Sequence, residues 1–157
     1  MKEEKTNVMR LLEQKKIAYT VHTCTEAEGL SGVQIAERLG EDPEKAFKTL
    51  VTCGSPRQYY VFVIPVAEEL DLKKAAKAVG EKSISMLPQK ELLPLTGYVH
   101  GGCSPVGMKK HFRTIVHQSA ALLDTMCVSA GKIGVQVELK PDALKTMVGS
   151  AYADLVV

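Results

Sequence analysis

The sequence lacks any long hydrophobic run, and this excludes a membrane-spanning helix. Its purely apolar stretches are short, as at residues 61–64, whereas a helix needs about 20 apolar residues to cross a bilayer. Residues 1–16 carry charges on both sides of a short apolar stretch, a pattern unlike that of a secretory signal. We therefore expect a cytoplasmic protein with no membrane partner.

Cysteine is scarce and widely spaced. The chain contains no C-x-x-C pair, and its four cysteines are Cys24, Cys53, Cys103 and Cys127. A chain of this length folds without disulfide staples, so reduced thiols are expected. The four histidines form no H-E-x-x-H pattern, and no Cys–His spacing is typical of zinc. The sequence therefore predicts neither a metal site nor a cofactor.

A strong net charge is also absent. The 20 Lys and Arg residues and the 18 Asp and Glu residues leave a net charge of +2, too small for the whole-molecule field to capture nucleic acid indiscriminately. We expect no DNA partner, and any polyanion must meet a local patch. Two basic clusters could form such a patch or be plain solvated surface: Lys73, Lys74 and Lys77, and Lys109, Lys110 and Arg113.

What is present is typical of one α/β domain over residues 1–157. The hydrophobic content of 45% is enough for a single core at this length. No internal repeat, low-complexity stretch or linker divides the chain. Because several expected strands are joined by short turns, a mixed sheet is favoured over a doubly wound parallel one.

Periodicity and capping residues predict interleaved helices and strands. Helices are expected over about residues 7–15, 31–39, 71–79 and 141–148, with a short turn of helix at 42–43 and a shorter helix from residue 88. Ser31 and Gln34 have the spacing of a capping box. Strands are expected at residues 17–22, 47–53, 58–64, 98–100, 113–117, 126–130 and 134–139, with 54–57 as a hairpin loop.

The densest group of glycines lies at residues 101–107, Gly-Gly-Cys-Ser-Pro-Val-Gly. Glycines let the backbone approach a ligand closely and aim N–H groups at an oxyanion or a phosphate. A tight turn between strands explains the same pattern, and the spacings of a P-loop or a dinucleotide fingerprint are absent. Cys103 could be a nucleophile in this loop, although packing is the more common role of a free cysteine.

Lys48 interrupts an apolar strand, where alternation places it on one face with Leu50 and Thr52. It could bind an anion, or it could be a solvated or edge-strand lysine. Residues 129–131, Ser-Ala-Gly, form a second turn of small residues. That turn could supply hydroxyl and N–H donors to a ligand, or it could be an ordinary turn.

Taken together, these motifs resemble the YbaK family, the stand-alone relatives of the editing domain of bacterial prolyl-tRNA synthetases. The resemblance rests on residues 47–50, 65–74, 97–107 and 129–132, which follow one another over almost the whole chain. It implies a compact α/β fold with a mixed, partly barrel-like sheet flanked by helices. It also implies a trans-editing aminoacyl-tRNA deacylase that acts mainly on Cys-tRNA(Pro), with Cys-tRNA(Cys) as a further substrate, and that meets prolyl-tRNA synthetase in a transient complex.

The resemblance further implies the residues of the site. Lys48 matches the family's essential lysine, which would bind the terminal adenosine or its phosphate, and Gly101 and Gly102 match its backbone donors. In that family the substrate's own thiol attacks its ester carbonyl, so no enzyme side chain is the nucleophile. The expected substrate-binding residues are Cys24, Thr49, Cys103, Ser104, Pro105, Ser129, Ala130, Gly131 and Gln136.

Two positions depart from the family's pattern and leave the amino-acid preference open. Cys24 stands where an aromatic residue such as tyrosine is often found, and Gln136 stands where an aspartate is often found. One alternative is a deacylase for alanine or serine on tRNA, which would need water as the nucleophile. The other is a non-catalytic module that binds tRNA or a nucleotide with the same glycine loop.

Overall fold

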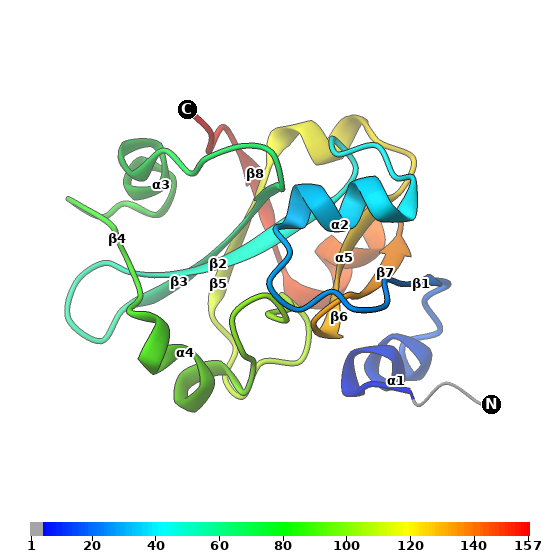
Figure 1. The fold of residues 1–157 in the computed structure, drawn as a ribbon. Coiled ribbons are helices and arrows are strands. Elements are labelled where there is room, and N and C mark those ends of the chain that lie inside the picture. The colour runs from blue at the N-terminus through cyan, green and yellow to red at the C-terminus, as the bar shows by residue number, and fades with distance from the viewer. Residues whose placement is uncertain (1–4) are drawn as a thin grey trace.

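The computed structural model describes residues 5–157, which form two open sheets flanked by helices (Figure 1). One sheet has five strands in the order β4-β2-β3-β5-β8, and the other has three in the order β1-β7-β6. The strands are β1 (Thr20–Thr23), β2 (Phe47–Cys53), β3 (Tyr59–Pro65), β4 (Ser85–Met86), β5 (Arg113–His117), β6 (Met126–Lys132), β7 (Val135–Leu139) and β8 (Ala151–Ala153). The helices are α1 (Asn7–Gln14), α2 (Gly32–Leu39), α3 (Leu72–Val79), α4 (Gln89–Thr96) and α5 (Pro141–Val148), with a 3₁₀ helix η1 (Gln118–Leu122).

Strand β3 is buried on both faces, and this explains its unbroken apolar sequence. Val61 and Val63 point to one side, into a core shared with α1, α5, β6 and β7. Phe62 and Ile64 point to the other side, into a second core closed by α3 and Leu155. The five-stranded sheet therefore separates two cores, with α3 at one end of the molecule and α1 at the other (Figure 1).

The five-stranded sheet is mixed, as the short connections predict. Strands β2 and β3 form an antiparallel hairpin around residues 54–58, while β5 pairs parallel with both β3 and β8. Helix α2 begins with the predicted capping box, in which the Ser31 hydroxyl accepts from the Gln34 N–H and the Gln34 side chain accepts from the Ser31 N–H. The Asp71 carboxylate caps α3 in a similar way, accepting from the N–H groups of Lys73 and Lys74.

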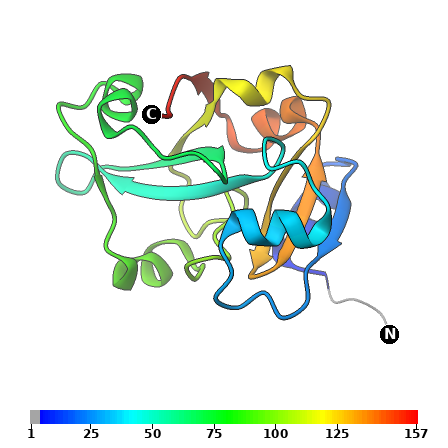
Figure 2. The same cartoon turned by 45° about the horizontal axis from the view of Figure 1, so that its top comes forward.

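The two sheets meet at one parallel bridge between Ala46 and Cys127. The N–H of Cys127 donates to the carbonyl of Lys45 at 2.8 Å, which joins the start of β2 to β6. Figure 2 shows β2 passing beside α2 towards the three-stranded sheet. Within residues 5–157 neither sheet closes on itself, so the partly barrel-like form implied by the resemblance is not confirmed.

Several local expectations were wrong for physical reasons. Residues 98–100 form no strand but a turn, in which the Gly102 N–H donates to the Val99 carbonyl at 3.0 Å. The first strand starts at Thr20 and not at Ile17, because the Ile17 N–H still donates to the carbonyl of Leu12 at the end of α1. Residues 42–43 lead into a turn without a helix. Strands β4 and β8 and the helix η1 were not expected, because elements this short show no periodicity.

None of the helices in residues 5–157 is long and apolar enough to cross a membrane.

Two leucines provide a matched test of the first core. Leu12 is fully buried in it, whereas Leu122 is 89% exposed. We expect Leu12→Ala to lower the free energy of unfolding by about 2–5 kcal/mol, because it removes buried methyl groups and leaves a cavity. Leu122→Ala should change it by less than about 0.5 kcal/mol. Urea unfolding followed by circular dichroism measures both, and equal losses would contradict the assigned core.

Candidate active site

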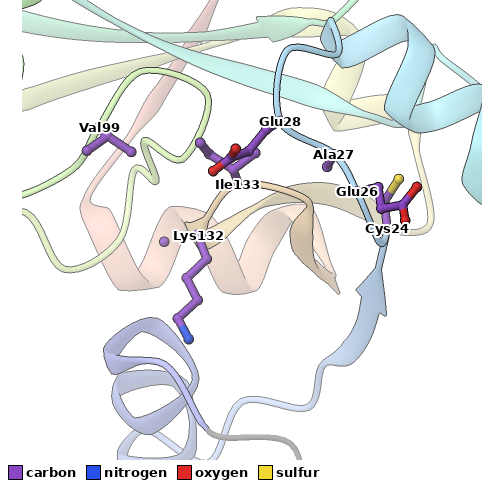
Figure 3. Close-up of a pocket in the computed structure, with 8 residues that line it drawn as sticks. Cys24, Glu26, Ala27, Glu28, Val99, Lys132 and Ile133 are labelled. Atoms are coloured by element: carbon purple, nitrogen blue, oxygen red, sulfur yellow. The ribbon is translucent and has the colours of Figure 1, made fainter.

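Three segments from distant parts of the chain line one open pocket of about 780 Å³ (Figure 3). The segment between β1 and α2 contributes Cys24, Glu26, Ala27 and Glu28, the loop after α4 contributes Val99, and the β6–β7 turn contributes Gly131, Lys132 and Ile133. Figure 3 shows the Lys132 side chain extending away from Glu28 and Glu26, towards α1. No histidine is among the eight lining residues, so the pocket lacks the usual partner of a serine or cysteine nucleophile.

Gly134 holds two of these segments together. The Cys24 N–H donates to the Gly134 carbonyl at 2.7 Å. Gly134 has a φ of +81°, and a Cβ there would lie 2.6 Å from both the Cys24 carbonyl oxygen and the Ala27 Cβ. A side chain cannot fit in that space, so only glycine allows the β1–α2 segment to approach the β6–β7 turn.

The glycine loop lies against the same turn. A Cβ on Gly102 would lie 3.2 Å from the backbone nitrogen of Ile133, so the two backbones are in close contact there. The N–H of Gly102 already donates to Val99. Within residues 5–157, the N–H groups of Gly101 and Cys103 have no acceptor. Among the described residues, the N–H groups on either side of Gly102 are therefore free to donate, as are those of Ser104 and Gly107 in the same part of the chain.

Tyr98 anchors the glycine loop to β6. Its hydroxyl donates to the carbonyl of Val106 at 2.5 Å, and the Ser104 hydroxyl accepts from the Val106 N–H at 3.2 Å. The tyrosine ring also lies against Gly131, where an added Cβ would come within 3.1 Å of it. Burial, together with the nearby Cys103, raises the pKa of Tyr98 to about 12, so its phenol stays protonated at neutral pH. The loop is held by fixed contacts on both sides.

Cys103 and Pro105 point away from the solvent. Cys103 is 8% exposed and belongs to the first core, and burial raises its pKa to about 12. A thiolate is therefore strongly disfavoured at this position, which favours a packing role for Cys103 over that of a nucleophile. Pro105 is buried and lines a second, smaller pocket with Leu11 and Met147.

Lys48 lies on β2 opposite Ile64, on the face that also carries Leu50. It is half-buried, and burial lowers its pKa against the opposing effect of Glu69 and Glu68. Within residues 5–157 it forms no ion pair. It is not one of the lining residues of the pocket.

The parallel bridge at Ala46 and Cys127 relates Lys48 to the second turn of small residues. Lys48 and Ser129 each follow the bridge by two residues, so they leave it in the same direction on neighbouring strands. On the opposite face of β2, the Thr49 hydroxyl is buried and has no partner within residues 5–157. Such an unpaired group is uncommon in a folded protein.

Ser129 and Gln136 face each other across β6 and β7. The Ser129 hydroxyl accepts from the Gly131 N–H at 3.0 Å, whereas Ala130 is fully buried in the first core. With the Gln136 amide nitrogen turned towards Glu41, it donates to that carboxylate at 2.6 and 2.9 Å. A carboxylate therefore lies beside position 136, although it comes from a different part of the chain.

Three residues that the sequence analysis did not group together lie on the same face of the three-stranded sheet as Ser129 and Gln136. His22, Cys127 and Glu138 lie on β1, β6 and β7, and each offers a potential metal ligand atom within 4.8 Å of the other two. Their positions are far apart in the sequence, so no motif of fixed spacing could have revealed them.

Comparisons with known proteins indicate one family by sequence and a shared fold by structure. The model of the aminoacyl-tRNA editing domain matches residues 27–147. A relative from Enterococcus faecalis, described as a candidate Cys-tRNA(Pro)/Cys-tRNA(Cys) deacylase, EbsC, is 45% identical over 98% of this chain and 94% of its own length. The solved structure of a candidate trans-editing enzyme for prolyl-tRNA synthetase has a TM-score of 0.83 and 21% identity, and covers 98% of this chain and 99% of its own. The solved structure of a hypothetical protein has a TM-score of 0.86 and 20% identity, and it covers 96% of this chain and 99% of its own. The last two show a shared fold.

The thiols should differ in reactivity according to their burial. A group with a pKa of about 12, as for Cys103, carries roughly one part in ten thousand thiolate at pH 8. Ellman's reagent should therefore modify the part-exposed Cys53 first in the native protein, and reach Cys103 only after unfolding. Peptide mapping by mass spectrometry identifies the labelled sites, and a Cys53→Ser variant should lose the fast phase. Native labelling of Cys103 as fast as that of Cys53 would restore it as a candidate nucleophile.

Proposed function

The chain belongs to the family of aminoacyl-tRNA editing domains, and on that basis we propose that it hydrolyses, in trans, the ester that joins cysteine to tRNA(Pro). The observation that carries this proposal is the identity of 45% with a candidate Cys-tRNA(Pro)/Cys-tRNA(Cys) deacylase over nearly the full length of both chains. Cys-tRNA(Cys) is the second proposed substrate. The proposed setting is the cytoplasm, in a transient complex with prolyl-tRNA synthetase.

The pocket fits an enzyme that holds and polarises its substrate. Its lining contains no histidine. The glycine loop does not line the pocket but packs against its residue Ile133, and there the free N–H groups of Gly101 and Cys103 are the proposed donors to a developing oxyanion. Gly102 would act differently from the expectation, because its own N–H is engaged by Val99. In this proposal Gly102 permits the close approach of the loop to the β6–β7 turn, and its neighbours supply the donors.

The proposed nucleophile is the thiol of the substrate's cysteine. The thiol loses its proton, its sulfur bonds to the carbonyl carbon, and the ester C–O bond breaks as the ribose oxygen gains a proton. Water then opens the cyclic thioester and releases free cysteine. The buried thiol of Cys103, with its pKa of about 12, is poorly suited to replace the substrate's thiol.

Lys48 is the proposed anchor for the terminal adenosine or its phosphate. It is half-buried and forms no ion pair within residues 5–157, so its ammonium is available to an anion. Ser129 leaves the sheet junction in the same direction, and this gives the phosphate a neighbouring hydroxyl. The Thr49 hydroxyl lies on the opposite face of β2, so it is not part of this anchor.

Replacing Lys48 tests this anchor. We expect Lys48→Ala to reduce kcat/KM for Cys-tRNA(Pro) by roughly 10²-fold or more, since a charge-assisted hydrogen bond is lost, while stability changes by less than about 1 kcal/mol. Lys90→Ala, which removes an exposed lysine from α4, is the control and should keep full activity. Unchanged turnover by a folded Lys48→Ala enzyme would refute the role of Lys48.

A modified substrate tests the proposed nucleophile. S-methylcysteinyl-tRNA(Pro) keeps the ester and the carbonyl but has a thioether that cannot attack, so we expect its hydrolysis to be nearly abolished. Steady-state deacylation is compared for Cys-, S-methyl-Cys-, Ser- and Ala-tRNA, each with and without prolyl-tRNA synthetase. Similar rates for the methylated and free cysteine would indicate water as the nucleophile. Faster hydrolysis of Ala- or Ser-tRNA would establish the alternative specificity.

A further inference from the structure

We propose that the three-stranded sheet carries a binding site for a divalent transition-metal ion such as Zn²⁺, formed by Cys127, His22 and Glu138. This site is separate from the proposed deacylase function and does not depend on it. It lies on the face of the sheet that is turned towards residues 41–45, near the C-terminal end of α2 (Figures 1 and 2).

The register of the sheet brings the three side chains together. Cys127 and Glu138 are direct partners across β6 and β7, and direct partners point to the same face. His22 on β1 is the partner of Gln136, two residues from Glu138 on the same face. One ligand atom from each residue lies within 4.8 Å of the others, so small side-chain movements would allow all three to contact one ion.

The donor set suits zinc better than a hard cation. Thiolate, imidazole and carboxylate are the three side-chain ligands that Zn²⁺ takes in proteins, whereas Ca²⁺ and Mg²⁺ prefer oxygen alone. The three side chains would leave the remaining coordination position of a tetrahedral ion to water, and the Glu41 carboxylate, which raises the pKa of the Cys127 thiol, adds negative charge nearby. When the ion binds, the thiol proton leaves to solvent and the sulfur lone pair forms the metal bond.

The Glu138 carboxylate is oriented for this role. Its Oε1 lies 2.7 Å from the His22 Nε2, so one ion could bind both atoms. Its Oε2 accepts from the Thr125 hydroxyl and lies 3.6 Å from the Lys45 ammonium. In the proposed site the ion lies between the His22 Nε2 and the Glu138 Oε1. Thr125 and Lys45 keep their contacts with the Glu138 Oε2 and hold the carboxylate in place, as groups around metal ligands commonly do.

The exposure of the three residues favours an ion over a reacting substrate. Cys127 is 2% exposed, so an ester carbonyl cannot reach its sulfur. The three residues therefore do not form a catalytic triad with Cys127 as the nucleophile. The side chains of His22 and Glu138 are 30% and 24% exposed, which leaves a route for a small ion. The side chain of Lys45 is 37% exposed and can stay on the solvent side of the carboxylate, away from the cation.

Cobalt provides a direct test in the tag-free chain of residues 1–157. Co²⁺ bound to a thiolate gives a sulfur-to-metal charge-transfer absorption in the near ultraviolet. We expect this band to saturate at one equivalent of Co²⁺ and to disappear when Zn²⁺ is added. Zn²⁺ should also raise the melting temperature of the protein, because it binds the folded state. The absence of the band in excess Co²⁺ would overturn the proposal.

Variants assign the band to the three residues. Cys127→Ser should abolish it, and Cys53→Ser, which changes a part-exposed cysteine outside the cluster, should leave it unchanged. Because Cys127 is buried, a second variant is needed in case the first does not fold. His22→Gln changes a part-exposed residue and should weaken Co²⁺ affinity by at least about tenfold. Wild-type affinity in folded His22→Gln, or an unchanged band in Cys127→Ser, would refute the site.

Discussion

The two sheets meet where Ala46 bridges Cys127 and the Cys127 N–H donates to the Lys45 carbonyl at 2.8 Å. This parallel junction sets the start of β2 beside β6, and both proposed sites depend on it. Two residues further along each strand, Lys48 and Ser129 continue in the same direction. At the junction itself, the Lys45 side chain reaches Glu138 and the Cys127 thiol belongs to the proposed metal site. A shift of this junction would therefore disturb both sites at once.

The proposed editing pocket is built mainly by the backbone. Gly134 lets the β1–α2 segment approach the β6–β7 turn, and Gly102 lets the glycine loop pack on the same turn. Tyr98 then fixes the loop through its bond to Val106. Donors that are fixed before the substrate arrives need little reorganisation when charge develops on an oxygen. Such a pocket suits a reaction whose nucleophile comes with the substrate.

Two buried cysteines show how neighbours decide the role of one residue type. Cys103 is surrounded by the first core, and burial alone raises its pKa to about 12. Cys127 is just as inaccessible, but its thiol also faces the carboxylates of Glu41 and Glu138, which raise its pKa further in the absence of a cation. A bound cation would reverse that effect, because it stabilises the thiolate that the carboxylates destabilise. The first environment favours packing, and the second favours a metal.

The sequence by itself determined the elements whose signals are local. The capping box at Ser31, the cap at Asp71 and the apolar run of β3 each specify an element through neighbouring residues. The motifs that follow one another along the chain also indicated the right family. The strand expected at 98–100 was wrong, because a turn bond from Gly102 to Val99 outweighs strand propensity there. Only the tertiary structure decided that the Gly102 N–H is engaged and that Glu41 lies beside Gln136. It also brought His22, Cys127 and Glu138 together. These contacts join residues far apart in the chain, and strand register, which no local pattern specifies, places them on one face.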